Sequence, residues 1–236
     1  MKTIGLIGGM SWESSALYYR QINQAVKARL GGLHSARLVL YSVDFFEIEE
    51  LQRAGNWAHA GELLAQAARS LQAAGAELLL LCTNTMHIVA PAIEAAVQIP
   101  LLHIADPTAA AIHSAGLTRI GLLGTRFTME QTFYKNRLVE QHGLQVLLPP
   151  PADRDSVHRI IFEELCLGQT LQASRQQYRR IMADLVAQGA QAIILGCTEI
   201  TLLVGEADAS VPLFDTTALH ALAGAQWALG ASPLSP

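Results

Sequence analysis

The stretch Thr3–Gly8 decides the fold, because its sequence TIGLIG recurs as RIGLLG at Arg119–Gly124. Each copy is typical of a short apolar strand that runs through glycine into a helix. The offset between copies drifts only from 116 to 114 to 112 residues along the chain. The sequence therefore indicates that the second half of the chain duplicates the first. Two later stretches recur in the same order: Ala74–Leu81 matches Gln188–Leu195, and Pro100–Leu102 matches Pro212–Phe214.

Short apolar runs alternate with longer helical segments inside each half. Leu38–Val43, Leu78–Cys82 and Ile120–Leu123 have the length and composition of strands. Gly61–Ala74 carries leucine and alanine at helical spacing. Strands that are apolar on both faces and lie between helices are typical of a parallel sheet. The sequence predicts an α/β fold of two pseudosymmetric parallel-sheet domains, with the active site in the cleft between them, where the carboxyl ends of strands meet.

Domain boundaries and helix starts follow from the same patterns. Asp106-Pro107 has the pattern of an N-cap and a first-position proline. Thr128 and Gln131 have the spacing of a capping box, which predicts a helix that begins there. We expect three segments: a first α/β domain at residues 1–115, a second at residues 116–215, and a C-terminal helix at 216–230 that packs back on the first.

Composition and charge exclude several classes of protein. The chain has 236 residues, 51% of them hydrophobic, so it can bury a core without disulfides. The formal net charge is -4, and no basic cluster is longer than Arg179-Arg180, which argues against a nucleic-acid or membrane partner. The apolar runs are strand-length, and no cleavage pattern of a signal peptide follows the first residues. We therefore expect a soluble cytoplasmic protein.

Residue spacing argues against a metal or an organic cofactor. The 3 cysteines lack a Cys-x-x-Cys pattern and the 8 histidines lack a His-x-x-x-His pair, so we expect no metal site. None of the lysines ends a strand, where a Schiff base to pyridoxal phosphate would be needed. The glycines of Gly5–Gly9 do not have the dinucleotide spacing and are expected to form a tight turn. We expect no cofactor.

Polar residues follow two equivalent strands. Cys82–His87 comes directly after a run of leucines, and Gly196–Glu199 takes the same place in the second half. The repeat superposes Thr83 on Cys197. A sheet needs no polar residues there, so the two loops predict a paired site at the carboxyl ends of the strands. The alternative is that the cysteines are inert core residues.

Four motifs stand out along the chain: Gly8–Glu13, Thr83–His87, Gly124–Arg126 and Gly196–Ile200. Together they resemble the cofactor-independent aspartate/glutamate racemases, and most closely their bacterial broad-specificity amino-acid racemase branch. The resemblance covers nearly the whole chain. It implies two pseudosymmetric α/β domains, two thiols that exchange a proton at Cα from opposite sides of a bound amino acid, and a homodimer.

The chain departs from this family at the first catalytic position. The family motif reads Cys-Asn-Thr-x-His, and its registration here places Thr83 where the family has a thiol. Cys82 lies one residue earlier, and strand alternation sends adjacent side chains to opposite sides. We expect Thr83 and Cys197 to be the catalytic pair and Cys82 to pack in the core. Cys82 as the thiol that faces Cys197 stays open.

A second departure concerns the substrate side chain. The family resemblance implies that typical aspartate racemases bind the side-chain carboxylate of the substrate with an arginine and a lysine. The corresponding regions here offer Glu49, Glu50 and Cys166. We therefore expect amino acids with acidic or neutral side chains as substrates.

The chemistry of racemisation suggests roles for the remaining polar residues. Removal of hydrogen from Cα beside a carboxylate builds up negative charge, which fixed donors must offset. A helix N-terminus can lower the pKa of a thiol toward neutrality, so we expect Cys197 as the base and Thr83 as the facing donor. His87 is placed to orient the first loop or simply to pack. The expected substrate-binding residues are Asn84, Thr85, Thr125, Thr198 and Glu199, to which the resemblance adds Met10 and Gln52.

Two other functions stay open. Relatives in the wider superfamily use a single cysteine for decarboxylation or cis/trans isomerisation, and Thr83 leaves a single cysteine here too. A non-catalytic amino-acid-binding protein would keep the donors and lose the reactivity of the thiol.

Overall fold

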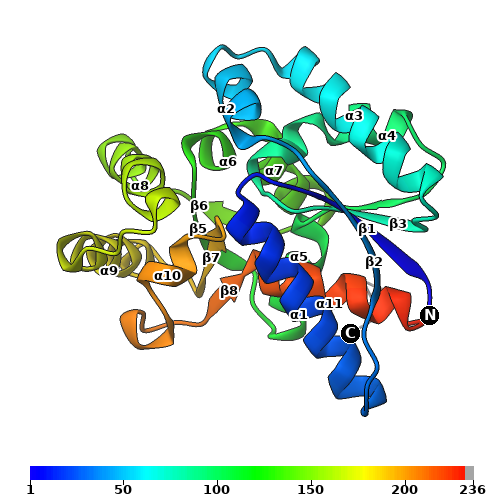
Figure 1. The fold of residues 1–236 in the computed structure, drawn as a ribbon. Helices are drawn as coiled ribbons and strands as arrows, with labels where there is room; N and C mark the ends of the chain where they lie inside the picture. Colours follow the sequence, from blue (N-terminus) through cyan, green and yellow to red (C-terminus); the bar gives the residue numbers. More distant parts are fainter. Residues whose placement is uncertain (232–236) are drawn as a thin grey trace. The chain divides into compact units, whose positions relative to one another are not determined.

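The chain folds into two units, each built on its own parallel sheet (Figure 1). The structure is a computed structural model, and it describes residues 1–231. The first unit contains Met1–Pro107 and the C-terminal stretch that begins at Thr217. The second unit contains Thr108–Thr216, so the division falls inside one helix, Ala105–Ser114. The expected boundary at residues 115 and 116 stays a prediction.

The sheet of the first unit has four parallel strands in the order β2-β1-β3-β4. Its central strands are almost wholly buried, whereas the edge strand β2 is largely exposed. The strands are β1 (Thr3–Gly8), β2 (Arg37–Ser42), β3 (Leu78–Leu81) and β4 (Leu101–Leu102). The helices are α1 (Trp12–Leu30), α2 (Phe45–Arg53), α3 (Trp57–Ala73), η1 (Thr85–Val89), α4 (Ala90–Ala95) and α11 (Thr216–Ala228).

The four leucines of β3 divide the core of the first unit into two layers. Leu79 and Leu81 pack in a cluster with residues of α3. Leu78 and Leu80 point to the opposite face, where residues of α1 and α11 cover them (Figure 1). This alternation is the period of a strand, and each buried leucine stabilises the fold by roughly 2 kcal/mol relative to exposure. Cys82 continues the alternation and lies, fully buried, in the layer of α1 and α11.

The second unit repeats this arrangement with the strand order β6-β5-β7-β8. The strands are β5 (Arg119–Gly124), β6 (Gln145–Leu147), β7 (Ala192–Gly196) and β8 (Leu213–Asp215). The helices are α5 (Ala105–Ser114), which the boundary crosses, α6 (Arg126–Glu130), α7 (Thr132–Asn136), the π-helix η2 (Arg137–Gln141), α8 (Pro151–Glu163), η3 (Leu165–Leu167), α9 (Gln172–Ala187), α10 (Ile200–Leu203) and η4 (Glu206–Asp208).

Equivalent positions of the two sheets follow the same packing rule. Gly5 of β1 and Gly121 of β5 both lie where a Cβ atom would come within 3.0 Å of a neighbouring side chain. Because glycine has no side chain, Leu71 of α3 and Leu185 of α9 can lie directly against the central strand. The matching strand order and the matching glycines confirm the predicted duplicated α/β fold.

Two predicted helix starts are wrong, one by two residues and the other by three. Helix α6 is capped by Thr125, whose Oγ1 accepts a hydrogen bond from the amide of Thr128 at 3.3 Å. Thr128 therefore lies in the first turn, because the earlier threonine reaches the free amide first. Helix α5 begins at Ala105, so Asp106 also lies inside the first turn rather than at the cap.

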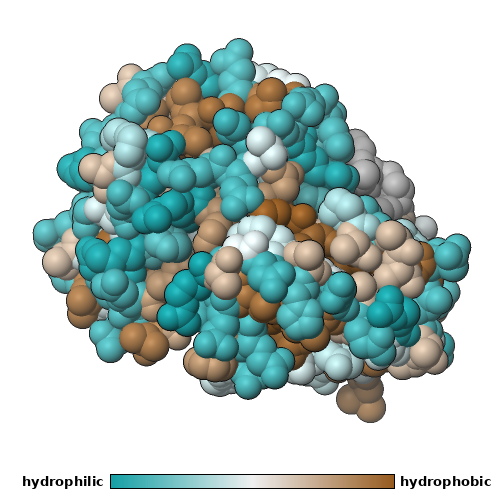
Figure 2. All heavy atoms as spheres, turned by 90° about the horizontal axis from the view of Figure 1, so that it is seen from above, coloured by the Kyte–Doolittle hydropathy of each residue, from teal (hydrophilic) through white to brown (hydrophobic). Residues whose placement is uncertain are grey.

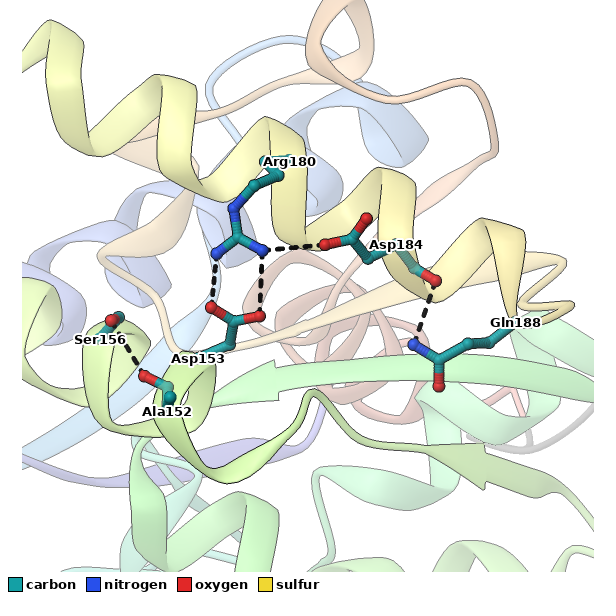
Figure 3. Close-up of polar contacts among 6 residues, drawn as sticks. All are labelled: Ala152, Asp153, Ser156, Arg180, Asp184 and Gln188. Atoms are coloured by element: carbon teal, nitrogen blue, oxygen red, sulfur yellow. Dashed lines mark hydrogen bonds and ion pairs between the residues drawn. The ribbon is translucent and has the colours of Figure 1, made fainter.

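Arg180 of α9 forms one ion pair with α8 and another within α9, on the surface of the second unit (Figure 3). The guanidinium of Arg180 contacts both carboxylate oxygens of Asp153 in α8, and its Nη1 lies 2.8 Å from Asp184 Oδ2 in α9. Half-exposed pairs of this kind contribute little stability, about 0 to 1 kcal/mol each. Helix α9 also carries Tyr178, whose pKa is raised by burial and, after it, by Cys197.

The visible surface is mainly hydrophilic, with smaller hydrophobic areas between the polar ones (Figure 2). In the part of the chain that the structure describes, no helix combines the length and apolar character that a membrane span requires.

Candidate active site

The loop after β3 carries Thr83. The ladder of β3 ends with the amide of Cys82, which donates to Ile7 O at 2.9 Å. The chain then turns, and the amide of Thr83 donates to Leu81 O at 2.8 Å. Thr83 is half-buried, while Asn84 and Thr85 beyond it are buried. The turn places Thr83 at the carboxyl edge of the first sheet, outside regular strand geometry.

His87 fastens this loop to the end of β4. Its Nδ1 lies 2.7 Å from Thr83 O, and its Nε2 lies 3.2 Å from the amide nitrogen of Ile104. An amide can only donate, so Nε2 accepts and Nδ1 carries the proton that Thr83 O accepts. His87 therefore holds the backbone of the proposed donor residue at a fixed place.

Two further buried histidines lie beside His87. The ring of His103 is 4.4 Å from the His87 ring, and the ring of His220, from α11, is 6.0 Å away. His220 Nδ1 lies 2.7 Å from the hydroxyl of Tyr18, and its Nε2 lies 2.9 Å from Leu102 O. Burial, with a smaller contribution from His87, lowers the pKa of His220 to about 3. The loop of Thr83 thus rests on buried, hydrogen-bonded rings.

Met10 and Gln52 lie at the same edge of the first sheet as Thr83. Met10 follows β1, and Gln52 is on α2; both are buried. Gln52 Nε2 donates to Met86 Sδ at 3.0 Å, and Met86 lies in η1, three residues beyond Thr83. The first unit therefore brings the expected residues Met10, Gln52, Thr83, Asn84 and Thr85 to one edge of its sheet.

The loop after β7 carries Cys197. Its Sγ donates to Glu199 Oε2 at 3.0 Å, and Thr198 Oγ1 donates to the same oxygen at 2.8 Å. Cys197 is 9% exposed and Glu199 is 8% exposed, so the contact is almost closed to solvent. Thr125 follows Gly124, which pairs with Gly196 in the sheet, and so lies at the same edge. The second unit thus brings Thr125, Cys197, Thr198 and Glu199 together.

The pKa of the Cys197 thiol is raised, whereas the sequence led us to expect a lowered pKa. Burial is the largest cause, and the negative charge of Glu199 is the next; both raise its pKa well above the ordinary range. Helix α10 has only 4 residues, too few to offset these effects. The resting thiol is therefore protonated. Burial likewise raises the pKa of the core residue Cys82.

Two residues near the loop of Cys197, Tyr178 and Glu164, were not predicted from the sequence. Tyr178 of α9 is buried, and Cys197 is among the charges that raise its pKa after burial itself. Glu164 is buried, and its Oε2 accepts from Ser174 Oγ at 2.5 Å. Cys166 lies two residues beyond Glu164, in η3, which contacts α10. The contacts of Tyr178 and Glu164 are with other elements, so no local spacing indicated these two residues.

No group of three or more His, Cys, Asp or Glu side chains that could hold a metal ion occurs among residues 1–231.

The two sheets have the same strand order, and in each of them a polar loop follows the third strand in sequence. One loop carries a hydroxyl and the other carries a thiol at the equivalent position. This arrangement defines a duplicated α/β enzyme. The profile of the family Asp/Glu/Hydantoin racemase matches residues 7–224, and the chain belongs to this family. The resemblance inferred from the sequence motifs is confirmed, and the chain is an isomerase. Membership of this family supports amino-acid racemase activity.

Solved structures and one further relative agree with this assignment. A candidate Asp/Glu racemase from Yersinia pestis has 63% sequence identity and a TM-score of 0.92 over 97% of this chain and 100% of that one. PH1733, an aspartate racemase homologue from Pyrococcus horikoshii OT3, has 34% identity and a TM-score of 0.82 over the same shares. The broad specificity amino-acid racemase RacX of Bacillus subtilis is 22% identical over 156 residues, which is 63% of either chain and so under two thirds of RacX.

Proposed function

We propose that this protein inverts Cα of free amino acids by proton transfer without a cofactor, with Cys197 and Thr83 as the catalytic pair. The observation that carries the proposal is the similar position of these residues in sheets with the same strand order: Cys197 is the first residue after β7, and Thr83 is the second residue after β3. A thiol accepts and returns a proton readily, whereas a threonine hydroxyl is a much weaker acid. The two faces of the substrate are therefore treated unequally.

The polar side chains around the pair supply the stabilisation that the reaction needs. Loss of the Cα proton leaves an electron pair that spreads into the adjacent carboxylate. Donors fixed before the reaction stabilise that charge most effectively, and buried loop residues are fixed in this way. The residues proposed to bind the substrate are Met10, Gln52, Asn84, Thr85, Thr125, Thr198 and Glu199.

The proposed substrates include amino acids with neutral side chains as well as aspartate and glutamate. Glu49 forms an ion pair with Arg53 at 2.8 Å, so the nearest cation of α2 is already partnered. Cys166 adds no charge of the kind that would bind a second carboxylate. The similarity to RacX, which is named as a broad specificity amino-acid racemase, favours the same range.

The test is a panel of single-enantiomer amino acids incubated with the protein in deuterium oxide. Proton NMR measures Cα exchange, and chiral chromatography measures inversion. The proposal predicts both for several neutral amino acids and for aspartate. Turnover of aspartate at least a hundredfold better than every neutral amino acid, about 2.8 kcal/mol, would contradict the broad range.

Other outcomes of the same panel would favour the alternatives. Loss of carbon dioxide, or conversion of an unsaturated acid between its cis and trans forms, would indicate the single-cysteine chemistry of the wider superfamily. Binding of amino acids without any exchange would indicate a binding protein.

We also propose a homodimer located in the cytoplasm, on the basis of the family resemblance. Light scattering of the purified protein should give a mass close to twice 25.4 kDa. A mass of one chain at micromolar concentration would contradict the dimer, and recovery outside the cytoplasmic fraction would contradict the location.

A further inference from the structure

The carboxylate of Glu199 is in direct contact with the thiol of Cys197. Sγ and Oε2 are 3.0 Å apart, and the thiol is the donor. The hydroxyl of Thr198 donates to the same oxygen at 2.8 Å, which fixes the carboxylate in this position. Both ends of the contact are buried, and all of these residues belong to the second unit. The arrangement is that of a proton donor held against its acceptor.

This contact creates a difficulty for Cys197 as a base. A thiol that donates its proton to a carboxylate cannot accept another proton until the first has left. Simple ionisation to water would leave a thiolate and a carboxylate in contact, two negative charges in a buried site. Burial and the charge of Glu199 raise the pKa of the thiol for this reason. The proton needs a destination that leaves only one negative charge.

We propose that Glu199 is the proton acceptor that converts the Cys197 thiol into the catalytic base. The Sγ–H bond breaks and the proton forms a bond with Oε2, which leaves a thiolate beside a neutral carboxyl group. The thiolate then takes the proton of the substrate's Cα–H bond, whose electron pair stays on the substrate. Cys197 and Glu199 together carry one negative charge before and after the first step. In the second step that charge passes to the substrate. This inference rests on the proposed function.

The other ionisable groups near Cys197 are less suited to this role. Cys166 approaches from η3 and Tyr178 from α9, and burial raises the pKa of Tyr178 well above its ordinary range. Glu164, after α8, is engaged by Ser174 at 2.5 Å and by Arg159 at 3.4 Å. Glu199 is the carboxylate whose oxygen lies within hydrogen-bond distance of Sγ.

The variant Glu199→Gln separates proton acceptance from mere electrostatic influence. Glutamine keeps the size of the side chain but cannot take up a proton, and it removes the negative charge beside the thiol. We expect slower alkylation of Cys197 by iodoacetamide at neutral pH, located by peptide mass spectrometry, because burial still disfavours the thiolate and the proton has lost its acceptor. We also expect Cα exchange in deuterium oxide to fall about 100-fold at about pH 7. Glu206→Gln, an exposed glutamate of the same unit, is the matched control and should change neither rate.

The pH profile of exchange gives a second readout. The wild-type rate should stay level between about pH 6 and pH 8, because the thiol reacts from its protonated state. The rate of Glu199→Gln should instead rise by up to about tenfold per pH unit, following formation of free thiolate. If Glu199→Gln does not fold, as judged by circular dichroism, Glu199→Asp takes its place. It retains a carboxyl group and should keep the level profile at a reduced rate.

Exchange by Glu199→Gln at or above the wild-type rate at neutral pH, with faster alkylation, would overturn the proposal and leave Glu199 as a group that only raises the thiol pKa. A rising profile for Glu199→Asp would overturn it as well. Absence of Cα exchange in the wild type would instead overturn the proposed function, and this inference with it.

Discussion

At the scale of single residues, the surroundings of Cys197 matter more than its type. Two cysteines, Cys82 and Cys197, follow apolar strands, and both are buried with raised pKa values. Cys82 contacts leucines in the core, whereas Cys197 donates to a carboxylate that can accept its proton. The same residue type is therefore inert in one half and suited to catalysis in the other.

The asymmetry of the pair predicts different results for two changes at Thr83. In Thr83→Ala, Cys197 can still remove a proton from its side, but the opposite face loses its donor. We expect Cα exchange to continue while inversion, followed by chiral chromatography, falls sharply. Thr83→Cys should restore a thiol on each side and raise activity on the slower enantiomer. Equal inversion by Thr83→Ala and the wild type would contradict this.

Cys82→Ala tests the registration of the first loop. Cys82 lies in the apolar layer of α1 and α11, so the change should cost only packing, about 1 kcal/mol of unfolding free energy in a denaturant titration. Exchange should stay at the wild-type rate. If Cys82→Ala abolished exchange while Thr83→Ala did not, the registration would be wrong by one residue.

At the scale of elements, short loops that lack regular structure are held by buried side chains from other elements. His87 joins the loop of Thr83 to Ile104, which lies two residues after the end of β4. The base of the loop is formed by His220 of α11, which Tyr18 of α1 contacts. A loop held in this way keeps Thr83 in place without the support of a strand.

His87→Phe tests this account of the loop. Phenylalanine fills the space but removes the hydrogen bonds of His87 to Thr83 O and to the amide of Ile104, at about 1 to 3 kcal/mol each. We expect a lower unfolding free energy and a lower kcat for inversion. His87→Asn restores a donor near the Nδ1 position and should recover part of kcat. Equal kcat for His87→Phe and the wild type would show that the loop is held without His87.

How far the sequence predicts the fold and the site depends on the range of the interactions. The alternation of Leu78 to Leu81 and the repeat at Gly121 are local patterns, so the sheets and their duplication could be predicted. The cap of α6 at Thr125 could not, because two threonines compete for one helix start. The contacts of His220 join residues 202 and 118 positions apart. The direction of the Cys197 pKa shift depends on burial and on the placement of Glu199, which no spacing rule contains.

At the scale of the whole molecule, the buried histidine cluster links the C-terminal helix to the stability of the first unit. Folding lowers the pKa of His220 to about 3, so the unfolded chain binds a proton below about pH 6.5 while the folded chain does not. The stability contributed by the neutral ring is complete above that pH and is lost as the pH falls toward 3. Asp106, His87 and His103 lie in the same cluster and share this environment.

His220→Gln isolates this effect from other acid-sensitive groups. The variant is expected to be less stable than the wild type at pH 7, but its unfolding free energy should fall less between about pH 7 and pH 4, by roughly 3 kcal/mol. Urea titrations at the two pH values measure the difference. Parallel losses in both proteins would show that His220 does not carry the pH dependence.

We propose that Cys197 moves the Cα proton without help from a metal or an organic cofactor. The most direct measurement is Cα deuterium exchange by protein dialysed against a chelator and freed of any pyridoxal phosphate, with Cys197→Ala treated in parallel. We predict that the wild type retains its full rate and that Cys197→Ala loses at least about 100-fold. Exchange that survives in Cys197→Ala, or that returns only when a metal ion or pyridoxal phosphate is added, would contradict the claim.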